Sequence, residues 1–237
     1  MCLIFVAVRP DDDTLLVVAA NRDEHYARPT AQAAFWQDHP NVLAGRDLQA
    51  GGTWLGVTRS GRFAAVTNFR EDPPRPLPPL SRGELTAGFL NSSLNPTAYL
   101  TNIDTQRNNF RGFNLILSDG EETTYYSNRE GKIRALSPGT YGLSNQLLDC
   151  DWPKVVDGRR QFNSLAAAGY PREDLFALLA CRGDGSAFSQ RFIATETYGT
   201  SASTVVRIRV DGSIEFEERN FGPMGEPDRV HQFLIEG

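Results

Sequence analysis

Lysine is scarce in this sequence of 237 residues, and cysteine, histidine and methionine are also rare. Lys132 and Lys154 are the two lysines, while the other 22 basic residues are arginines, so there are few candidates for a Schiff-base lysine. The three cysteines form no CxxC pair, which predicts neither a zinc site nor a disulfide framework. The three histidines have no metal-ligand spacing, and we expect no metal and no cofactor.

Long apolar runs are also missing. No apolar stretch approaches the roughly 18 residues that a membrane-spanning helix needs, so no transmembrane segment is predicted. The first apolar run, residues 2–8, is short and stops at Arg9-Pro10-Asp11, which favours a strand over a signal peptide. A net charge of −5 disfavours nucleic acid as the partner. We expect a cytoplasmic protein whose oligomeric state the sequence leaves open.

Turn and helix signals along the chain predict an α+β fold of one domain, residues 1–237. Helices are expected over 81–90, from Asn95-Pro96 onward, and over 152–168 and 173–180. Strands do not alternate singly with helices, so a doubly wound parallel sheet is not expected. Residues 29–40 are predicted to be a loop, and residues 72–79, with five prolines, an irregular surface connection. The predicted strands are residues 2–8, 14–21, 52–58, 62–68, 113–118, 123–128, 133–136, 140–144, 192–195, 204–210 and 213–219.

Two of these strand pairs predict hairpins whose register can be calculated. A turn centred near Asp11 makes paired positions sum to about 22, which sets Cys2 opposite Ala20. Residues 21–23 then leave the sheet beside the start of the chain. In the second hairpin the pairs sum to about 120, which sets Asn68 near Gly52.

Cys2 is the first candidate for chemistry. Removal of Met1 makes Cys2 the N-terminal residue, so a thiol and a free α-amine share one residue. The amine has a reference pKa near neutrality and can act as a base. A thiol needs only modest activation to become a nucleophilic thiolate. The alternative is that Cys2 is a small buried residue opening an edge strand.

The run Asn21-Arg22-Asp23-Glu24 lies across the predicted hairpin from Cys2. A guanidinium beside a thiol favours the thiolate, and a carboxylate can orient an α-amine. We therefore include Asn21, Arg22 and Asp23 in the predicted catalytic set. Glu24 and the following His25 are predicted to line the site. The alternative is a solvated turn, with His25 in a surface or packing role.

Asparagines at two strand ends supply candidate oxyanion donors. Asn68 ends the strand 62–67 and Asn145 follows the strand 140–144. A side-chain amide at a strand end can donate to an oxyanion in a cleft, although both residues can also be ordinary turn residues. Trp54 and Trp152 are expected in the pocket wall or the core.

These residues stand in segments that resemble the NRDE family, also called the transport and Golgi organisation protein 2 family. That family is similar to the N-terminal nucleophile hydrolases of the choloylglycine hydrolase and penicillin acylase group. The resemblance implies a four-layer αββα sandwich of two mostly antiparallel sheets. The matching segments are Met1-Cys2-Leu3-Ile4, Asn21-Arg22-Asp23-Glu24, Arg28-Pro29-Thr30, Gly51-Gly52-Thr53-Trp54-Leu55-Gly56, Thr67-Asn68-Phe69-Arg70, Ser81-Arg82-Gly83, Gly142-Leu143-Ser144-Asn145, Trp152-Pro153-Lys154 and Tyr198-Gly199-Thr200.

The resemblance also implies hydrolysis of a non-peptide amide or a thioester, with Cys2 as nucleophile and Asn145 and Asn68 as oxyanion donors. Arg70, within a matching segment, is predicted to bind substrate. The hydrolases separate their Arg and Asp by three positions, whereas here they are adjacent. Ser201 stands where the family often has a basic residue, so a second cation is either missing or supplied by Arg191 or Arg207.

A binding function is the alternative, because a hydrolase fold can be reused without catalysis. The family has been connected with secretory organisation, haem movement and lipid metabolism, so the same cleft would carry haem or an acyl lipid or acyl-CoA. The partner is therefore a small amide or acyl substrate, or haem as a transported ligand. A c-type haem is not expected, since no CxxCH sequence is present.

Overall fold

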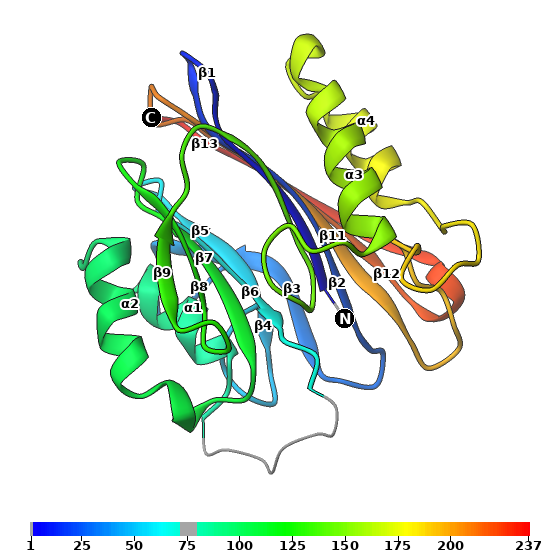
Figure 1. Cartoon of the computed structure of the whole chain (residues 1–237), viewed down its shortest axis with the longest axis horizontal. Coiled ribbons are helices and arrows are strands. Elements are labelled where there is room, and N and C mark those ends of the chain that lie inside the picture. Colours follow the sequence, from blue (N-terminus) through cyan, green and yellow to red (C-terminus); the bar gives the residue numbers. More distant parts are fainter. Residues whose placement is uncertain (1, 72–79) are drawn as a thin grey trace. The chain divides into compact units, whose positions relative to one another are not determined.

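The computed structural model describes residues 2–71 and 80–237, which form two compact units (Figure 1). Unit 1 contains the residues up to Arg28 together with Pro138–Ser144 and Leu148–Gly237. Unit 2 contains Pro29–Ser137 and Asn145–Leu147. Met1 and the proline-rich connection expected over residues 72–79 lie outside the described residues. A single domain over 1–237 stays a prediction.

Unit 1 is built on a six-stranded antiparallel sheet with the strand order β10-β1-β2-β11-β12-β13. Its helices α3 (Pro153–Ser164) and α4 (Arg172–Leu179) pack on one face of this sheet (Figure 1). Short 3₁₀ turns lie at Ala166–Ala168 and Pro223–Gly225. The strands are β1 (Cys2–Asp11), β2 (Thr14–His25), β10 (Gly139–Leu143), β11 (Tyr198–Arg209), β12 (Ile214–Phe221) and β13 (Pro227–Ile235).

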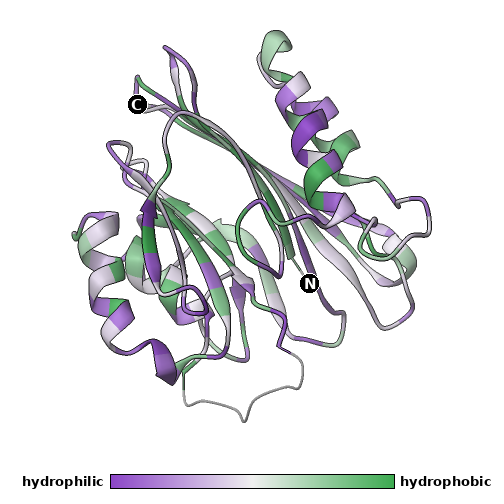
Figure 2. Cartoon of the chain, viewed as in Figure 1, coloured by the Kyte–Doolittle hydropathy of each residue, from purple (hydrophilic) through white to green (hydrophobic). Residues whose placement is uncertain are grey.

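Strand alternation decides which residues of β1 and β2 face these helices. Odd-numbered residues such as Leu3, Phe5 and Ala19 join one apolar cluster with Val155 and Phe162 of α3. Even-numbered residues point to the opposite face. The central strands of both sheets carry most of the apolar sequence (Figure 2). The first sheet therefore has buried residues on both faces along β1 and β2.

A glycine lets α3 approach the sheet closely. A Cβ atom on Gly158 would lie 2.1 Å from Cζ of Phe5. The Phe5 ring also stacks on Phe162, with 5.8 Å between ring centroids. These contacts fix the middle and the C-terminal half of α3 against β1.

Unit 2 is built on a seven-stranded antiparallel sheet in which the strands follow chain order from β3 to β9. Helices α1 (Gly83–Leu90) and α2 (Pro96–Thr105) pack against it, and a 3₁₀ turn follows at Arg107–Asn109. The strands are β3 (Thr30–Phe35), β4 (Val42–Asp47), β5 (Leu55–Thr58), β6 (Phe63–Asn68), β7 (Phe113–Ser118), β8 (Thr123–Ser127) and β9 (Lys132–Ala135).

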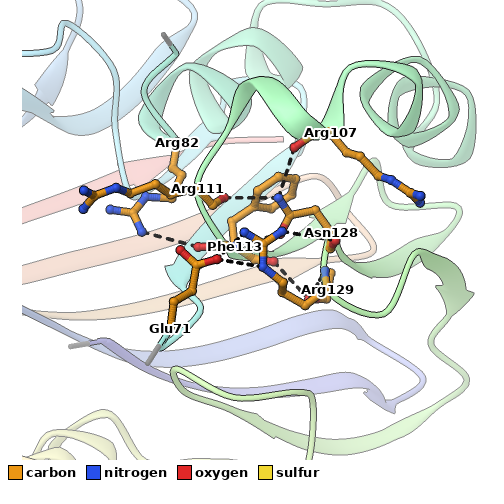
Figure 3. A network of polar contacts seen from close by, with 9 residues as sticks. Glu71, Arg82, Arg107, Arg111, Phe113, Asn128 and Arg129 are labelled. Atoms are coloured by element: carbon orange, nitrogen blue, oxygen red, sulfur yellow. Dashed lines mark hydrogen bonds and ion pairs between the residues drawn. The ribbon is translucent and has the colours of Figure 1, made fainter. Parts of the chain in front are cut away.

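Asn128 secures the start of β7 in unit 2 (Figure 3). Its Oδ1 accepts a hydrogen bond from the N–H of Phe113 at 2.9 Å, while its Nδ2 donates to the carbonyls of Arg107 at 3.2 Å and Arg111 at 3.1 Å. Next to it, Arg129 forms an ion pair with Glu71. The Asn128 side chain thus ties the residue after β8 to three backbone groups of the segment 107–113.

Most predicted elements of secondary structure are confirmed. The predicted strand 113–118 has the same bounds as β7, and the Asn95 side chain caps α2 by accepting from the N–H of Ala98 at 2.8 Å. Leu55 pairs with Ala65, as the sum of 120 predicts. Three predictions are wrong or incomplete: residues 192–195 form only an isolated bridge, residues 29–40 include β3, and β4 and β13 were not expected.

The register of the first hairpin also differs from the prediction. Cys2 pairs with Arg22 and not with Ala20, and β2 continues to His25, so residues 21–23 stay within the sheet. The reason lies in the turn. Asp11 pairs with Thr14 after an irregularity between Val8 and Asp11, where Arg9 has a φ of 44°. The true turn therefore lies later in the chain than the sequence suggests.

None of the helices in the described parts of the chain is long and apolar enough to cross a membrane.

Candidate active site around Cys2

Cys2 opens β1 in unit 1 and is half-buried. Its carbonyl accepts a hydrogen bond from the Ser144 hydroxyl at 2.8 Å. Its partner across the strand pair is Arg22, and directly opposite residues in an antiparallel pair have Cβ atoms about 4.5–5.5 Å apart. The two side chains therefore leave the same face of the sheet as neighbours.

Arg22 is only 7% exposed, and its guanidinium is held from two sides. Nη1 donates to the Ser201 hydroxyl at 3.0 Å, and Nη2 lies 3.8 Å from a carboxylate oxygen of Glu24. Ser201 in turn donates to the Arg22 carbonyl at 3.2 Å. Ser201 occupies an irregularity of β11 between Thr200 and Ala202, which brings its hydroxyl to this position. Ser201, which stands where the family often has a basic residue, therefore holds the side chain of Arg22 in place through two hydrogen bonds.

Asp23 lies on the opposite face of β2 and is 5% exposed. Its Oδ1 accepts a hydrogen bond from the Thr200 hydroxyl at 2.7 Å, and that hydroxyl accepts from the N–H of Ile193 at 3.0 Å. Burial raises the pKa of the Asp23 carboxyl above its ordinary value, although Thr200, Lys154 and Arg22 act in the opposite direction. The Asp23 carboxyl is thus shielded from water, and its burial disfavours the charged form.

Asn21 is fully buried, and its amide is engaged on both sides. Nδ2 donates to the carbonyls of Leu179 at 3.0 Å and Arg191 at 2.7 Å, and Oδ1 accepts from the Ser203 hydroxyl at 2.6 Å. These bonds tie β2 to the end of α4 and to the segment before β11. They describe a structural anchor, and the catalytic role of Asn21 stays a prediction.

The residues predicted to line the site in unit 1 occupy different environments. Glu24 is half-buried and lies 4.0 Å from Nε of Arg28 in addition to its contact with Arg22. His25 is exposed, with its ring 5.1 Å from that of Tyr198. Trp152 stacks on Phe188 with 4.3 Å between ring centroids and stands immediately before α3. Their substrate-binding role stays a prediction.

Four predicted site residues belong to unit 2. Asn145 is buried and donates to the Asn68 carbonyl at 2.7 Å, while the Asn145 carbonyl accepts from the N–H of Arg70 at 2.7 Å. Asn68, Asn145 and Arg70 are therefore brought together. Trp54 packs over Gly45, where a Cβ atom would lie 2.1 Å from the indole. Their roles as oxyanion donors and substrate-binding residues stay predictions.

Lys154 is a residue of this region that the sequence did not single out. It follows Pro153 in α3, is 2% exposed, and interacts electrostatically with Asp23, Cys2 and Cys150. The two alternative cations lie elsewhere: Arg207 donates to the Gly169 and Tyr170 carbonyls at 2.8 Å, and Arg191 donates to Gln161 at 3.0 Å. The signals available in the sequence were the rarity of lysine and the place of Lys154 in the family-like segment Trp152-Pro153-Lys154.

No group of three or more His, Cys, Asp or Glu side chains suited to a metal ion occurs within residues 2–71 and 80–237. The geometry offers the chemistry of a thiol with one cationic side chain, that of Arg22, directly across the strand pair, and with a carboxyl group on the neighbouring residue of the partner strand.

Comparison with known proteins identifies the family of this chain. Residues 1–223 match the family model described as Transport and Golgi organisation 2. The chain belongs to this family. The transport and Golgi organization protein 2 homolog of Bos taurus is 34% identical, and the match covers 100% of both chains. The human homolog is 33% identical with 93% of each chain covered, and the Drosophila melanogaster protein is 24% identical with 98% and 97% covered.

Two solved structures resemble this member of the Transport and Golgi organisation 2 family. One is a Caenorhabditis elegans ortholog of N-acylethanolamine-hydrolyzing acid amidase, with a TM-score of 0.52 and 10% identity over 86% of this chain and 92% of that one. The other is the conjugated bile acid hydrolase of Clostridium perfringens, with a TM-score of 0.54 and 9% identity over 98% and 92%. These likenesses show the fold alone, and they confirm the predicted α+β fold class with two mostly antiparallel sheets.

Proposed function

We propose that this chain is an N-terminal nucleophile hydrolase in which Cys2 cleaves a non-peptide amide or a thioester of a small molecule. The observation that carries the proposal is the pairing of Cys2 with the buried, clamped Arg22. A fixed guanidinium beside a thiol favours the thiolate, which is the nucleophilic form. The hydrolase-like fold supports the same reaction class.

The reaction follows from the groups on Cys2 once Met1 has been removed. The thiol passes its proton to the α-amine, and the thiolate sulfur forms a bond to the substrate carbonyl carbon. The amine then returns the proton to the leaving nitrogen or sulfur as that bond breaks. Water then attacks the resulting thioester and gives up a proton to the amine. As the carbon–sulfur bond breaks, the amine passes this proton to the sulfur, so that the carboxylic acid, the free thiol and the neutral amine are regenerated. Asp23 is suited to hold the amine because it lies at the same sheet end.

The comparisons support the choice of nucleophile. The bile acid hydrolase structure is that of the mutant C2A, in which alanine replaces a cysteine at position 2, and this chain also has its candidate cysteine there. The names of both solved neighbours describe hydrolases of amide or conjugated substrates. The particular substrate of this chain, and its expected cytoplasmic location, stay predictions.

An electrophilic acyl probe tests the proposal. We expect incubation with an activated amide or thioester panel, followed by intact-protein mass measurement, to show one acyl group on Cys2 and its slow release by water. Cys2→Ala should show no adduct and no hydrolysis, while Cys150→Ala keeps both. An unmodified Cys2 across the whole panel, in folded protein lacking Met1, contradicts the hydrolase proposal.

A carrier function is the second candidate, and a cavity in unit 1 favours it. The cavity has a volume of about 550 Å³, a size typical of small-molecule sites. It lies between α4 and the strands β12 and β13, where Phe176, Phe192 and Phe221 provide apolar walls and Arg182 a cationic rim. These walls suit an acyl chain with an anionic end. Its described lining has no His, Cys, Tyr or Met to ligate haem iron.

Titration distinguishes the two carrier ligands. A saturable rise in fluorescence with a fluorescent fatty acid, unchanged in Cys2→Ala, supports acyl binding at this cavity. For haem, a saturable Soret shift that disappears on replacing one His or Cys is required. Absence of saturation with both ligands contradicts the carrier function.

A further inference from the structure

Three arginines lie near the start of β7 in unit 2, and each is half-buried. Arg82 immediately precedes α1, Arg111 lies two residues before β7, and Arg129 lies two residues after β8. Arginine is mostly exposed in folded proteins and is rarely buried without a compensating charge, because burial removes the guanidinium group from water. A group of half-buried arginines therefore indicates negative charge nearby.

Gly112 is the residue around which these arginines are arranged. Its carbonyl accepts a hydrogen bond from Nη1 of Arg82 at 3.3 Å. A Cβ atom on Gly112 would lie 3.2 Å from Nε of Arg129 and 3.2 Å from the carboxyl carbon of Glu71. Arg111 is the preceding residue, so the three arginines border one short piece of backbone.

Glu71 balances one of the three positive charges. Its carboxylate accepts a hydrogen bond from Nε of Arg129 at 2.9 Å and forms an ion pair with the same guanidinium group. The side chains of Arg129 and Glu71 are only 18% and 12% exposed. This pair is therefore largely withdrawn from water, and the negative charge of Glu71 is used mainly by Arg129.

Arg111 has no such counter-ion. Its Nε is buried without a hydrogen-bond partner, and its guanidinium group makes neither a hydrogen bond nor an ion pair within residues 2–71 and 80–237. In Figure 3 the side chains of Arg82 and Arg111 extend from the network toward the same side. Three arginines and one glutamate leave an excess of two positive charges among these four side chains.

The position of Arg82 adds to this excess of positive charge. Arg82 is the N-cap residue of α1, and its side chain makes no capping hydrogen bond. The N-terminus of a helix carries partial positive charge, so it disfavours a cation and favours an anion. An anion bound beside Arg82 would offset this repulsion and also the repulsion between the guanidinium groups.

We infer that Arg82, Arg111 and Arg129 form a binding site for a phosphate group, either free or carried by a small organic molecule. A phosphate group has three strong acceptor oxygens and up to two negative charges, which matches the excess of two positive charges. Guanidinium groups can donate paired hydrogen bonds to such oxygens, whereas a carboxylate offers only two oxygens and one charge. The inference goes beyond the proposed function and does not depend on a reaction at Cys2.

Calorimetric titration of the full chain tests the inference with inorganic phosphate, phenyl phosphate and acetate as probes. At about pH 8 and low salt, where a phosphate ester is doubly charged, we expect one saturable site for a phosphate probe and much weaker binding of acetate. Tighter binding of phenyl phosphate identifies the ligand as an organic phosphate, and tighter binding of inorganic phosphate identifies it as the free ion.

Substitutions that each change one charge locate the site. Arg111→Gln should raise the Kd for the tighter phosphate probe at least about tenfold, because it removes a charged hydrogen-bond donor. Glu71→Gln should lower the Kd, because it frees Arg129 to donate to the phosphate. If these arginines only support the fold, Glu71→Gln has no reason to strengthen binding.

Arg107→Gln is the matched control. Arg107 lies in the same segment, is 44% exposed and is paired with Asp104, so its loss changes the net charge as much as Arg111→Gln does. Its Kd should stay close to that of the parent. Circular dichroism checks that each variant is folded, and Arg111→Met replaces Arg111→Gln if the latter unfolds.

Three results would overturn the inference. The first is that no phosphate probe saturates the parent protein. The second is that acetate binds as tightly as phosphate, and the third is that Arg107→Gln weakens phosphate binding as much as Arg111→Gln, which would mean that only the net charge of the chain attracts the anion.

Discussion

Cys2 and Arg22 face each other directly across β1 and β2, two residues away from the pairing that the turn sequence suggests. The guanidinium cannot move away from this position without breaking its bond to Ser201, whose hydroxyl both accepts from and donates to Arg22. The thiol therefore has a fixed cationic neighbour before any substrate is present. Fixed charges of this kind act without reorganisation when negative charge develops.

Replacing the cysteines one at a time should separate the nucleophile from the other two thiols. We expect Cys2→Ala to lower kcat at least about 10³-fold and Cys2→Ser to leave weak activity, because a hydroxyl is harder to ionise than a thiol. Cys150→Ala and Cys181→Ala should stay near the parent. Full activity of Cys2→Ala, measured by substrate hydrolysis, would disprove the role of Cys2.

Cys181 is an informative control because it is also expected to be chemically reactive. Burial acts to raise the pKa of its thiol, but the N–H of Gly183 and the side chain of Arg191 outweigh that effect, and the pKa lies below its ordinary value. Alkylation of Cys181 should therefore occur near neutral pH without loss of hydrolysis. Peptide mass after partial alkylation, plotted against residual activity, checks this.

Processing of Met1 is the second prediction. Cys2 can use its own amine as a base only if that amine is free, so active protein should have the intact mass of the chain lacking one methionine residue. N-terminal sequencing should then begin at Cys2. Fully active protein that retains Met1 would rule out the α-amine as the base.

Asp23 gives a prediction for the dependence of stability on pH. Its pKa is raised in the folded state, so the folded protein binds a proton there more tightly than the unfolded chain does. The stabilisation that proton binding at Asp23 gives is complete below the unfolded pKa of 3.8, and it is lost as the pH rises through the folded pKa. Asp23→Asn should therefore be more stable than the parent at neutral pH, with the difference closing as the pH falls toward 4.

Urea unfolding between pH 3.5 and 8 measures this difference. Asn keeps an acceptor for the Thr200 hydroxyl, so the comparison isolates the charge. Asp174→Asn, at an exposed position of α4, is the control and should follow the parent at every pH. A constant difference between Asp23→Asn and the parent would show that Asp23 does not titrate as we expect.

Asn128 gives a prediction for unit 2. Asn128→Ala leaves the buried N–H of Phe113 and the carbonyls of Arg107 and Arg111 without their partner, and we expect a loss of about 2–3 kcal/mol in the free energy of unfolding. Asn91→Ala removes one exposed bond to the Ala87 carbonyl and should cost less than about 0.5 kcal/mol. Equal losses in urea denaturation would contradict the anchoring role of Asn128.

Local signals in the sequence were sufficient to predict an element of secondary structure where its own residues determine its conformation. The cap at Asn95 and the alternating strand 113–118 needed no tertiary information. β3 was missed because its alanine-rich sequence, Thr30–Phe35, has weak strand propensity and is stabilised by pairing with β4. Such pairing depends on the rest of the sheet, which single-sequence patterns do not contain.

In the candidate site, too, some features could be predicted from local sequence, whereas others depend on tertiary packing. Cys2 and Arg22 could be brought together by counting along a hairpin, although the irregular turn changed the register. Lys154 could not be found in this way, because a lysine in the first turn of a helix is ordinarily exposed. Its burial results from packing of α3 and the Trp152–Phe188 pair, which are distant from β1 in sequence.

Side chains alternate between the two faces of the sheet along β2, so the number of residues in the first hairpin decides which side chain lies on the face of Cys2. Arg22 lies on the face of Cys2, and Asp23 lies on the face of α3. Deleting one residue within β2 ahead of Arg22 would bring Asp23 opposite Cys2 and turn Arg22 toward the face of α3, presenting a carboxylate to the thiol. Insertion of two residues in the turn near Asp12 would preserve both. Insertions or deletions of an even number of residues therefore keep Arg22 on the face of Cys2. An odd number within β2 places Arg22 and Asp23 on the opposite faces of the sheet from those they occupy here.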